Sequence, residues 1–266
     1  MKKNLSSISG VTLIEILIGI VISVIMMGAM FTSYNAVNNT YSQVIDRAKI
    51  SQTGRDVVGM LVRDIRLAGF KHFEDTSRPP DNYIPIKVYK KKKADACDKI
   101  ELMHGDKKVK VGSKPIAFEF VTYKITYECK ESQIIDKKTK KKIDAYGIYK
   151  SKEKWTGSKW EAPNQSTDDF VFKDELIVDH IQDMIFLAID KDGKILDHGS
   201  TTTLNDSNKI TVVDILLSLR SQKEFYRDKE ERESFSLGKN TNKKFTDKFL
   251  RESIVVSAHT RNMGLE

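Results

Sequence analysis

Residues 10–31 read GVTLIEILIGIVISVIMMGAMF, and this stretch decides how the rest of the 266-residue chain must be arranged. About 20 apolar residues, at roughly 1.5 Å each, allow a helix to cross the hydrocarbon of a bilayer. Lys2 and Lys3 precede the run, so the positive-inside rule predicts a cytoplasmic N-terminus and a chain that continues outside the cytoplasm. Glu15 breaks the pattern, because a carboxylate is costly in lipid and needs a partner or a purpose.

Three kinds of N-terminal segment share a basic start and an apolar helix. A secretory signal peptide fits poorly, because the run is too long and no A-x-A cleavage site follows it. A simple signal anchor fits the length but leaves Gly10 and Glu15 unexplained. The third kind is a processed anchor in which both residues have a role.

The sequence GVTLIE at residues 10–15, behind a short basic leader, resembles the class III signal of type IV prepilins. The resemblance implies that an inner-membrane prepilin peptidase cuts after Gly10 and methylates the new N-terminus at Val11. It also implies that Glu15 pairs with the N-terminal amine of a neighbouring subunit in a filament. Many pilins have phenylalanine at the position of Val11 and proline at that of Thr32, and both departures favour a minor component.

Beyond residue 31, apolar residues recur at the three- and four-residue steps of an amphipathic helix. They are Tyr34, Val37, Tyr41, Val44, Ile45, Ala48, Val58, Leu61, Val62, Ile65 and Ala68. No proline appears before Pro79, and Gly69 is a natural C-cap, so we expect one helix from Val11 to Ala68. The closing segment, RDIRLAGF at residues 63–70, resembles large minor pilins of the PilW type.

After Pro80 the period changes from 3.6 towards two, which favours strands. Strands are expected at 84–89, 99–104, 116–128, 147–150, 176–189, 210–220 and 252–260. The charged run 221–248 is expected to be a long loop or a weakly ordered insertion. One helix followed by many strands predicts an α+β fold, with the helix packed on an antiparallel sheet. The type IV pilin-like architecture that the resemblance implies is the same.

Further patches resemble PilW-type proteins: residues 176–193, the strand 212–220, and Arg261-Asn262 after the last strand. The expected organisation is a leader at 1–10, a transmembrane or filament-core helix at 11–31, its amphipathic extension at 32–70 and a periplasmic or extracellular β-rich domain at 71–266. DKDG at 190–193 has two interpretations, a calcium loop or a turn. The turn is favoured, because Asp-Gly between apolar strands is a hairpin signal and the further ligands of an EF-hand are missing.

Cys97 and Cys129 admit one intramolecular pairing. Both follow the predicted membrane segment, so an oxidising periplasm favours a disulfide over two buried thiols.

The net charge of +8 hides an asymmetry. Residues 87–160 carry 21 basic and 10 acidic groups, whereas residues 161–266 carry 15 and 20. The runs Lys90–Lys93 and Lys137–Lys142 have three interpretations: weak contact with DNA, packing against the acidic part of another subunit, or simple solvation.

No GxSxG, HExxH, Walker A or Rossmann pattern occurs, and the five histidines lack ligand spacing, so we expect no enzyme, cofactor or metal. The resemblance implies a minor pilin that helps to initiate or tip a type IV pilus, with prepilin peptidase, other minor pilins and the major pilin as partners. It would reside in the inner membrane and then in the periplasm and pilus. Two alternatives stay open, a J-like pseudopilin of type II secretion and a membrane-anchored adhesin or DNA-uptake receptor.

Overall fold

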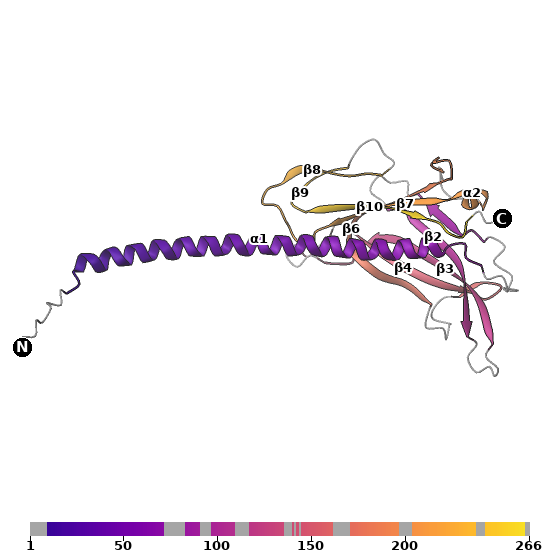
Figure 1. Cartoon of the computed structure of the whole chain (residues 1–266), viewed down its shortest axis with the longest axis horizontal. Coiled ribbons are helices and arrows are strands. Elements are labelled where there is room, and N and C mark those ends of the chain that lie inside the picture. Colours follow the sequence, from indigo (N-terminus) through magenta and orange to yellow (C-terminus); the bar gives the residue numbers. More distant parts are fainter. Residues whose placement is uncertain are drawn as a thin grey trace, which may run out of the picture. The chain divides into compact units, whose positions relative to one another are not determined.

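The computed structural model describes residues 10–71, 83–90, 97–109, 117–135, 140, 142–143, 145–161, 171–196, 204–237 and 243–263. The chain divides into two compact units, Met1–Ala48 and Lys49–Glu266. Helix α1 (Leu13–Leu67) is continuous through the boundary, which confirms the long helix expected from the sequence (Figure 1).

In the first unit, the side chains of α1 are exposed almost throughout, and residues 13–31 are mostly apolar. Two of its hydroxyl groups bond to the helix itself: Ser23 donates to the Gly19 carbonyl at 2.7 Å, and Thr40 donates to the Ala36 carbonyl at 2.9 Å. Such back-bonding satisfies hydroxyl groups where no water is available. The first part of α1 is therefore chemically suited to an apolar environment.

In the second unit, α1 packs one face against a sheet. The buried face includes Ile50, Val57, Leu61 and Ile65, spaced as an amphipathic helix requires. The helix comes so close to the sheet at Gly54 that an added Cβ would lie 2.4 Å from the Cδ1 atom of Ile254. A larger residue at this position would require the side chains of Ile254 and Leu219 to move.

The helix ends as its sequence predicts. Gly69 follows the last turn with a φ of +81°, a conformation that glycine adopts without the strain of a Cβ. Its N–H donates to the Met103 carbonyl at 2.9 Å, which ties the end of the helix to the sheet.

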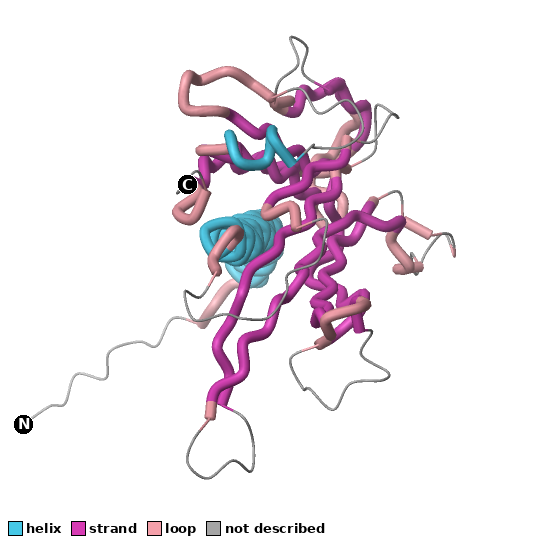
Figure 2. Tube along the Cα trace, turned by 90° about the vertical axis from the view of Figure 1, so that its right-hand side faces the viewer, coloured by secondary structure: helices cyan, strands magenta, loops and turns pink. Residues whose placement is uncertain are grey.

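The sheet is antiparallel throughout and has the strand order β1-β2-β3-β4-β6-β7-β10, with β5 paired to β4. Figures 1 and 2 show strands of this sheet beside the C-terminal part of α1. Its strands are β1 (Ile86–Tyr89), β2 (Lys99–Val109), β3 (Phe118–Glu131), β4 (Tyr146–Trp155), β5 (Trp160–Glu161), β6 (Phe172–Ile189), β7 (Val212–Arg220) and β10 (Arg251–His259). Each strand expected from the sequence corresponds to one of these. The α+β class and the helix-on-sheet arrangement are confirmed.

Strand β6 is longer than predicted and irregular. Asp174 and His180 both have positive φ, at 56° and 64°. The register between β6 and β4 shifts beside both residues: between Tyr146 and Ile148, opposite His180, and between Lys150 and Lys152, opposite Asp174. Such bulges bend a strand and increase its twist, which lets one strand pair with two neighbours along different parts of its length.

The expectation of a loop at 221–248 was wrong. The segment contains a two-stranded hairpin, β8 (Glu230–Ser234) and β9 (Lys243–Asp247). Buried polar contacts attach the hairpin to the main sheet: Lys243 pairs with Asp183 of β6 at 2.8 Å, and Ser234 lies 3.1 Å from Ser218 of β7. Charged strands show little hydrophobic alternation, so periodicity could not reveal them.

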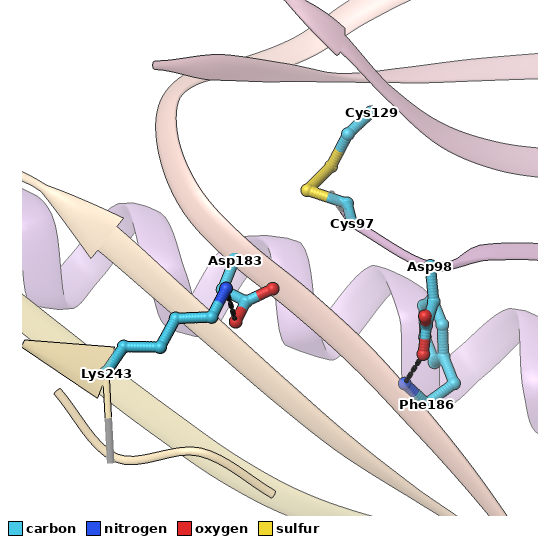
Figure 3. The surroundings of a disulfide bond; sticks show 6 residues. All are labelled: Cys97, Asp98, Cys129, Asp183, Phe186 and Lys243. Carbon is cyan, nitrogen blue, oxygen red and sulfur yellow. Dashed lines mark hydrogen bonds and ion pairs between the residues drawn. A yellow bond between two sulfur atoms is a disulfide. The ribbon is translucent and has the colours of Figure 1, made fainter. Parts of the chain in front are cut away.

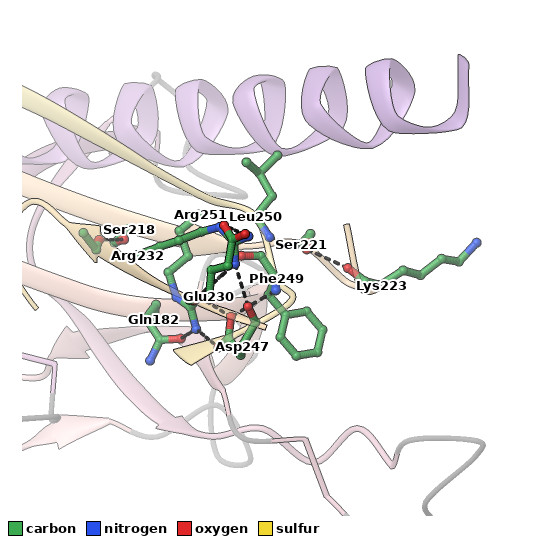
Figure 4. A network of polar contacts seen from close by, with 11 residues as sticks. Gln182, Ser218, Ser221, Lys223, Glu230, Arg232, Asp247, Phe249, Leu250 and Arg251 are labelled. Atoms are coloured by element: carbon green, nitrogen blue, oxygen red, sulfur yellow. Dashed lines mark hydrogen bonds and ion pairs between the residues drawn. The ribbon is translucent and has the colours of Figure 1, made fainter. Parts of the chain in front are cut away.

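Beside the hairpin, Arg251 organises a polar network (Figure 4). Its guanidinium donates to both carboxylate oxygens of Asp247, at 2.6 and 2.8 Å, and to Gln182 at 3.3 Å. Arg232 of β8 donates to the Asp247 carbonyl at 2.7 Å. The short helix α2 (Leu204–Lys209), which the sequence did not suggest, precedes β7.

The turn predicted at residues 190–193 is confirmed. The Asp190 carboxylate accepts hydrogen bonds from the N–H groups of Asp192 and Lys194, both at 2.9 Å, and Gly193 has a φ of +77°. These contacts are those of an aspartate-initiated turn that glycine completes.

Candidate functional site

The first described residues form a capped helix start. The Glu15 carboxylate accepts hydrogen bonds from the Thr12 N–H at 2.8 Å and the Thr12 hydroxyl at 2.9 Å. The Glu15 N–H points back to the Thr12 hydroxyl at 3.4 Å. This reciprocal arrangement is a capping box, in which two orphan donors of the first turn are satisfied. The Thr-x-x-Glu spacing of residues 12–15 is the sequence signal from which this cap could have been predicted.

Gly10 and Val11 immediately precede this cap. No atom lies within 4 Å of a Cβ built on Gly10, and the Val11 side chain is 72% exposed. Among the described residues of this unit, nothing packs against the side of Gly10 or covers the Val11 side chain.

The helix that follows is one candidate membrane span among the described residues, with a mean hydropathy of 2.5 in its most apolar window. Large apolar side chains along it are exposed, from Leu13 at 80% to Val44 at 60%. Exposed apolar surface on this scale requires lipid or other protein around it. Tyr34, Val37 and Tyr41, which the sequence placed on the amphipathic face, are also exposed, at 64–68%.

In the second unit, a buried charge fixes the helix to the sheet. The Asp64 carboxylate accepts hydrogen bonds from the Tyr127 hydroxyl at 2.6 Å and the Lys150 Nζ at 2.7 Å. Asp64 is 2% exposed and Lys150 7%. Burial raises the pKa of Tyr127, and the negative charge of Asp64 raises it further. The Tyr127 hydroxyl therefore stays protonated and remains a hydrogen-bond donor.

Two of the patches that carried the PilW resemblance, residues 63–70 and Arg261-Asn262, meet at the end of α1. The Asn262 side chain donates to the Arg66 carbonyl at 3.1 Å and lies 3.5 Å from the Ala68 carbonyl. An added Cβ on Gly69 would lie 2.9 Å from the Asn262 carbonyl oxygen. The chain beyond β10 therefore caps the last turn of the helix, which explains why small and amide residues occur at these positions.

Cys97 and Cys129 are joined by a disulfide beside the sheet (Figure 3). Cys97 is fully buried and precedes β2, and Cys129 of β3 is 3% exposed. The neighbouring Asp98 carboxylate accepts a hydrogen bond from the Phe186 N–H at 3.1 Å. The cross-link and this contact hold one end of β2 to β3 and β6.

The structure of this chain is similar to that of a type IV-like pilin from Thermus thermophilus, with a TM-score of 0.50. The match covers 80% of this chain and 95% of the other, at 9% sequence identity. The fold of this chain is type IV pilin-like. No protein-family model matches the sequence, and no curated protein matches it either.

The lysine runs of this pilin-fold chain differ in their surroundings. Lys90 is engaged, because its Nζ contacts both the Asp98 carboxylate and the Phe186 carbonyl. Lys142 donates to the Gln133 side chain at 2.8 Å on the surface. Residues 91–93, 137–139 and 141 lie outside the described residues. A DNA contact through these runs stays a prediction.

Proposed function

We propose that this chain is a minor pilin: a non-enzymatic subunit that is cut after Gly10, methylated at Val11 and used to initiate or tip a type IV pilus. The observation that carries the proposal is a pilin fold whose apolar helix begins with a capped turn directly after Gly10. Lys2 and Lys3 would hold the leader in the cytoplasm, and the β-rich domain would face the periplasm and then the pilus.

The exposed apolar helix supports a role in a filament. The same surface can lie in lipid before assembly and against other helices afterwards, because both environments exclude water. In this proposal Glu15 pairs with the amine that processing creates on a neighbouring subunit. The partners are prepilin peptidase, the major pilin and other minor pilins.

The first test is the N-terminal mass of the mature protein from membranes of the native host. The proposal predicts a chain that begins at methylated Val11, and accumulation of the uncut chain when Gly10→Ala is introduced. Thr12→Val is the matched control, because it removes the capping hydroxyl and leaves the Gly10–Val11 bond unchanged. An intact Met1, or a cut beyond Met30, would contradict the proposal.

A second experiment separates the charge of Glu15 from its capping role. Glutamine also serves in capping boxes, so Glu15→Gln keeps the helix start and removes the charge. Thr12→Val does the reverse, since it removes a hydroxyl partner and keeps the carboxylate.

We expect processing in both variants, but loss of incorporation into sheared filaments only in Glu15→Gln. Equal incorporation of the two variants would remove the assembly role of Glu15. If a strain that lacks this gene keeps its pili and loses protein secretion, the subunit belongs to a type II secretion pseudopilus instead.

A further inference from the structure

A groove of about 470 Å³ lies at the C-terminal end of α1, on the second unit. Two segments distant in sequence form it. Helix α1 and its end contribute Arg63, Arg66, Leu67 and Phe70, and the chain after β10 contributes Arg261 and Asn262. We refer to this surface as the arginine groove.

Three guanidinium groups line the arginine groove, and none of its described lining residues carries a carboxylate. Arg63 pairs with the Oδ1 atom of Asp64 at 3.6 Å, while Lys150 and Tyr127 bind the other carboxylate oxygen, so Arg63 is partly neutralised. Arg66 lies in the last helical turn, where a cation is favourable beside the helix dipole. This effect accounts for one arginine. It does not account for Arg261, which a separate segment brings to the same place.

Apolar surface lies between the charges. Leu67 is 41% exposed and Phe70 is 39% exposed, and Val62 also lines the groove. Large apolar side chains beside these arginines form a surface that a small inorganic anion would use only in part. A peptide that carries both a carboxylate and an apolar side chain would use all of it.

The frame of the groove is fixed before anything binds. The Asn262 side chain donates a hydrogen bond to the Arg66 carbonyl at the end of the helix. Asp64, two residues before Arg66, is held in the core by Lys150. Gly59 lines the groove, and nothing lies within 4 Å of a Cβ added there. The missing side chain keeps one end of the groove open.

We propose that the arginine groove binds an acidic peptide segment with an exposed apolar side chain, supplied by a different subunit of the same filament. That the segment comes from another filament subunit rests on the proposed function. That the segment is acidic and partly apolar rests on the residues that line the groove. Arginine presents a planar, bidentate donor to carboxylates, so three of them favour an acidic partner over a neutral one.

The test of the chemistry uses the full chain in detergent and fluorescence anisotropy. The probe is a labelled octapeptide with four glutamates around a leucine and a phenylalanine. The comparison peptides replace the two apolar residues with serine, or the glutamates with lysine. We expect the first probe to bind, and its binding to weaken as the salt concentration rises. The serine peptide should bind at least fivefold more weakly, and the lysine peptide should not bind.

Variants locate the binding. Arg66→Glu with Arg261→Glu should weaken the first probe at least tenfold, whereas Arg227→Glu, an exposed arginine outside the groove, should not change it. Gly59→Phe keeps every arginine and should weaken binding by filling the open end. Equal loss in Arg227→Glu, or no binding by the unaltered chain, overturns the proposal. Anionic vesicles that bind with the same arginine dependence while the peptide does not would also overturn it.

The source is tested in the native host with a photo-crosslinking amino acid in place of Leu67. An adduct with an acidic segment of another filament subunit supports the proposal, and an adduct with a second copy of this chain overturns it. If processing after Gly10 fails but the octapeptide still binds, the proposed function falls and the peptide site stands. If processing holds and the octapeptide does not bind, only the groove proposal falls.

Discussion

Removing the charge of Asp64 should be among the most destabilising changes to this domain. Asp64→Asn leaves Lys150 as a buried cation without its counter-ion, 2.7 Å from the substituted side chain. Breaking a buried ion pair by removing one partner costs about 3–5 kcal/mol. Domains of ordinary stability unfold at about 5–15 kcal/mol, so the loss would be a large share of the total.

A double-mutant cycle separates the pair from its surroundings. Lys150→Met leaves the opposite charge buried and should also cost about 3–5 kcal/mol. Asp64→Leu combined with Lys150→Met removes both charges and keeps side chains of similar volume, so it should cost much less than the sum. Glu231→Gln is the matched control, because the Glu231–Lys244 pair has a similar separation of 2.8 Å but both side chains are 58% exposed. An exposed pair contributes about 0–1 kcal/mol.

The assay is urea unfolding of the full chain in detergent, followed by fluorescence of Trp155 and Trp160, whose rings lie 5.2 Å apart beside β4. The free energy of unfolding is extrapolated to water for each variant. If Asp64→Asn costs under about 1 kcal/mol, like the control, the buried-charge reasoning is refuted. If the double variant loses as much free energy of unfolding as the two single variants together, the reasoning is also refuted.

Three other predictions concern single features. Replacing Cys97 and Cys129 with serine should lower the free energy of unfolding by about 3–4 kcal/mol, as expected for a cross-link between residues 32 apart, and non-reducing electrophoresis should show the lost bridge. Gly69→Ala should lower the melting temperature, because φ is +81° there, whereas Gly59→Ala has open space and should raise stability by up to about 1 kcal/mol. Burial lowers the pKa of His104 below its usual 6.5, so below pH 6.5 the unfolded chain binds a proton that the folded one resists. Stability should therefore fall as the pH drops below 6.5, and His104→Phe should flatten this fall in pH-dependent urea midpoints.

The helix was predictable because several local signals agree along it. The apolar run, the three- and four-residue steps and the glycine at its end each follow from one segment of sequence. The observed helix, Leu13–Leu67, lies within two residues of the expected bounds at each end. The strands were predictable for the same reason, and their ends were less accurate where charged residues begin or extend them, as at Asp174 in β6.

Features that depend on distant partners were not predictable. Asp64 is 86 residues from Lys150, and neither residue has a pattern that identifies the other. The hairpin β8–β9 is polar on both strands, and it is held by pairs such as Lys243–Asp183 that only the fold brings together. The arginine groove likewise needs Arg66 and Arg261 to meet. Tertiary contacts, and not local propensity, determine each of these.

The capping box changes how Glu15 should be interpreted. From the sequence, a carboxylate in an apolar helix is expected to require a neighbouring subunit, because lipid offers it no partner. In the structure Thr12 already supplies two hydrogen bonds from within the same chain. Cleavage after Gly10 would not remove them, since the donors belong to Thr12. These hydrogen bonds satisfy part of the carboxylate within its own chain, and by themselves they give no reason for a second subunit. What Thr12 cannot supply is a positive charge, so the case for assembly depends on the difference between Glu15→Gln and Thr12→Val.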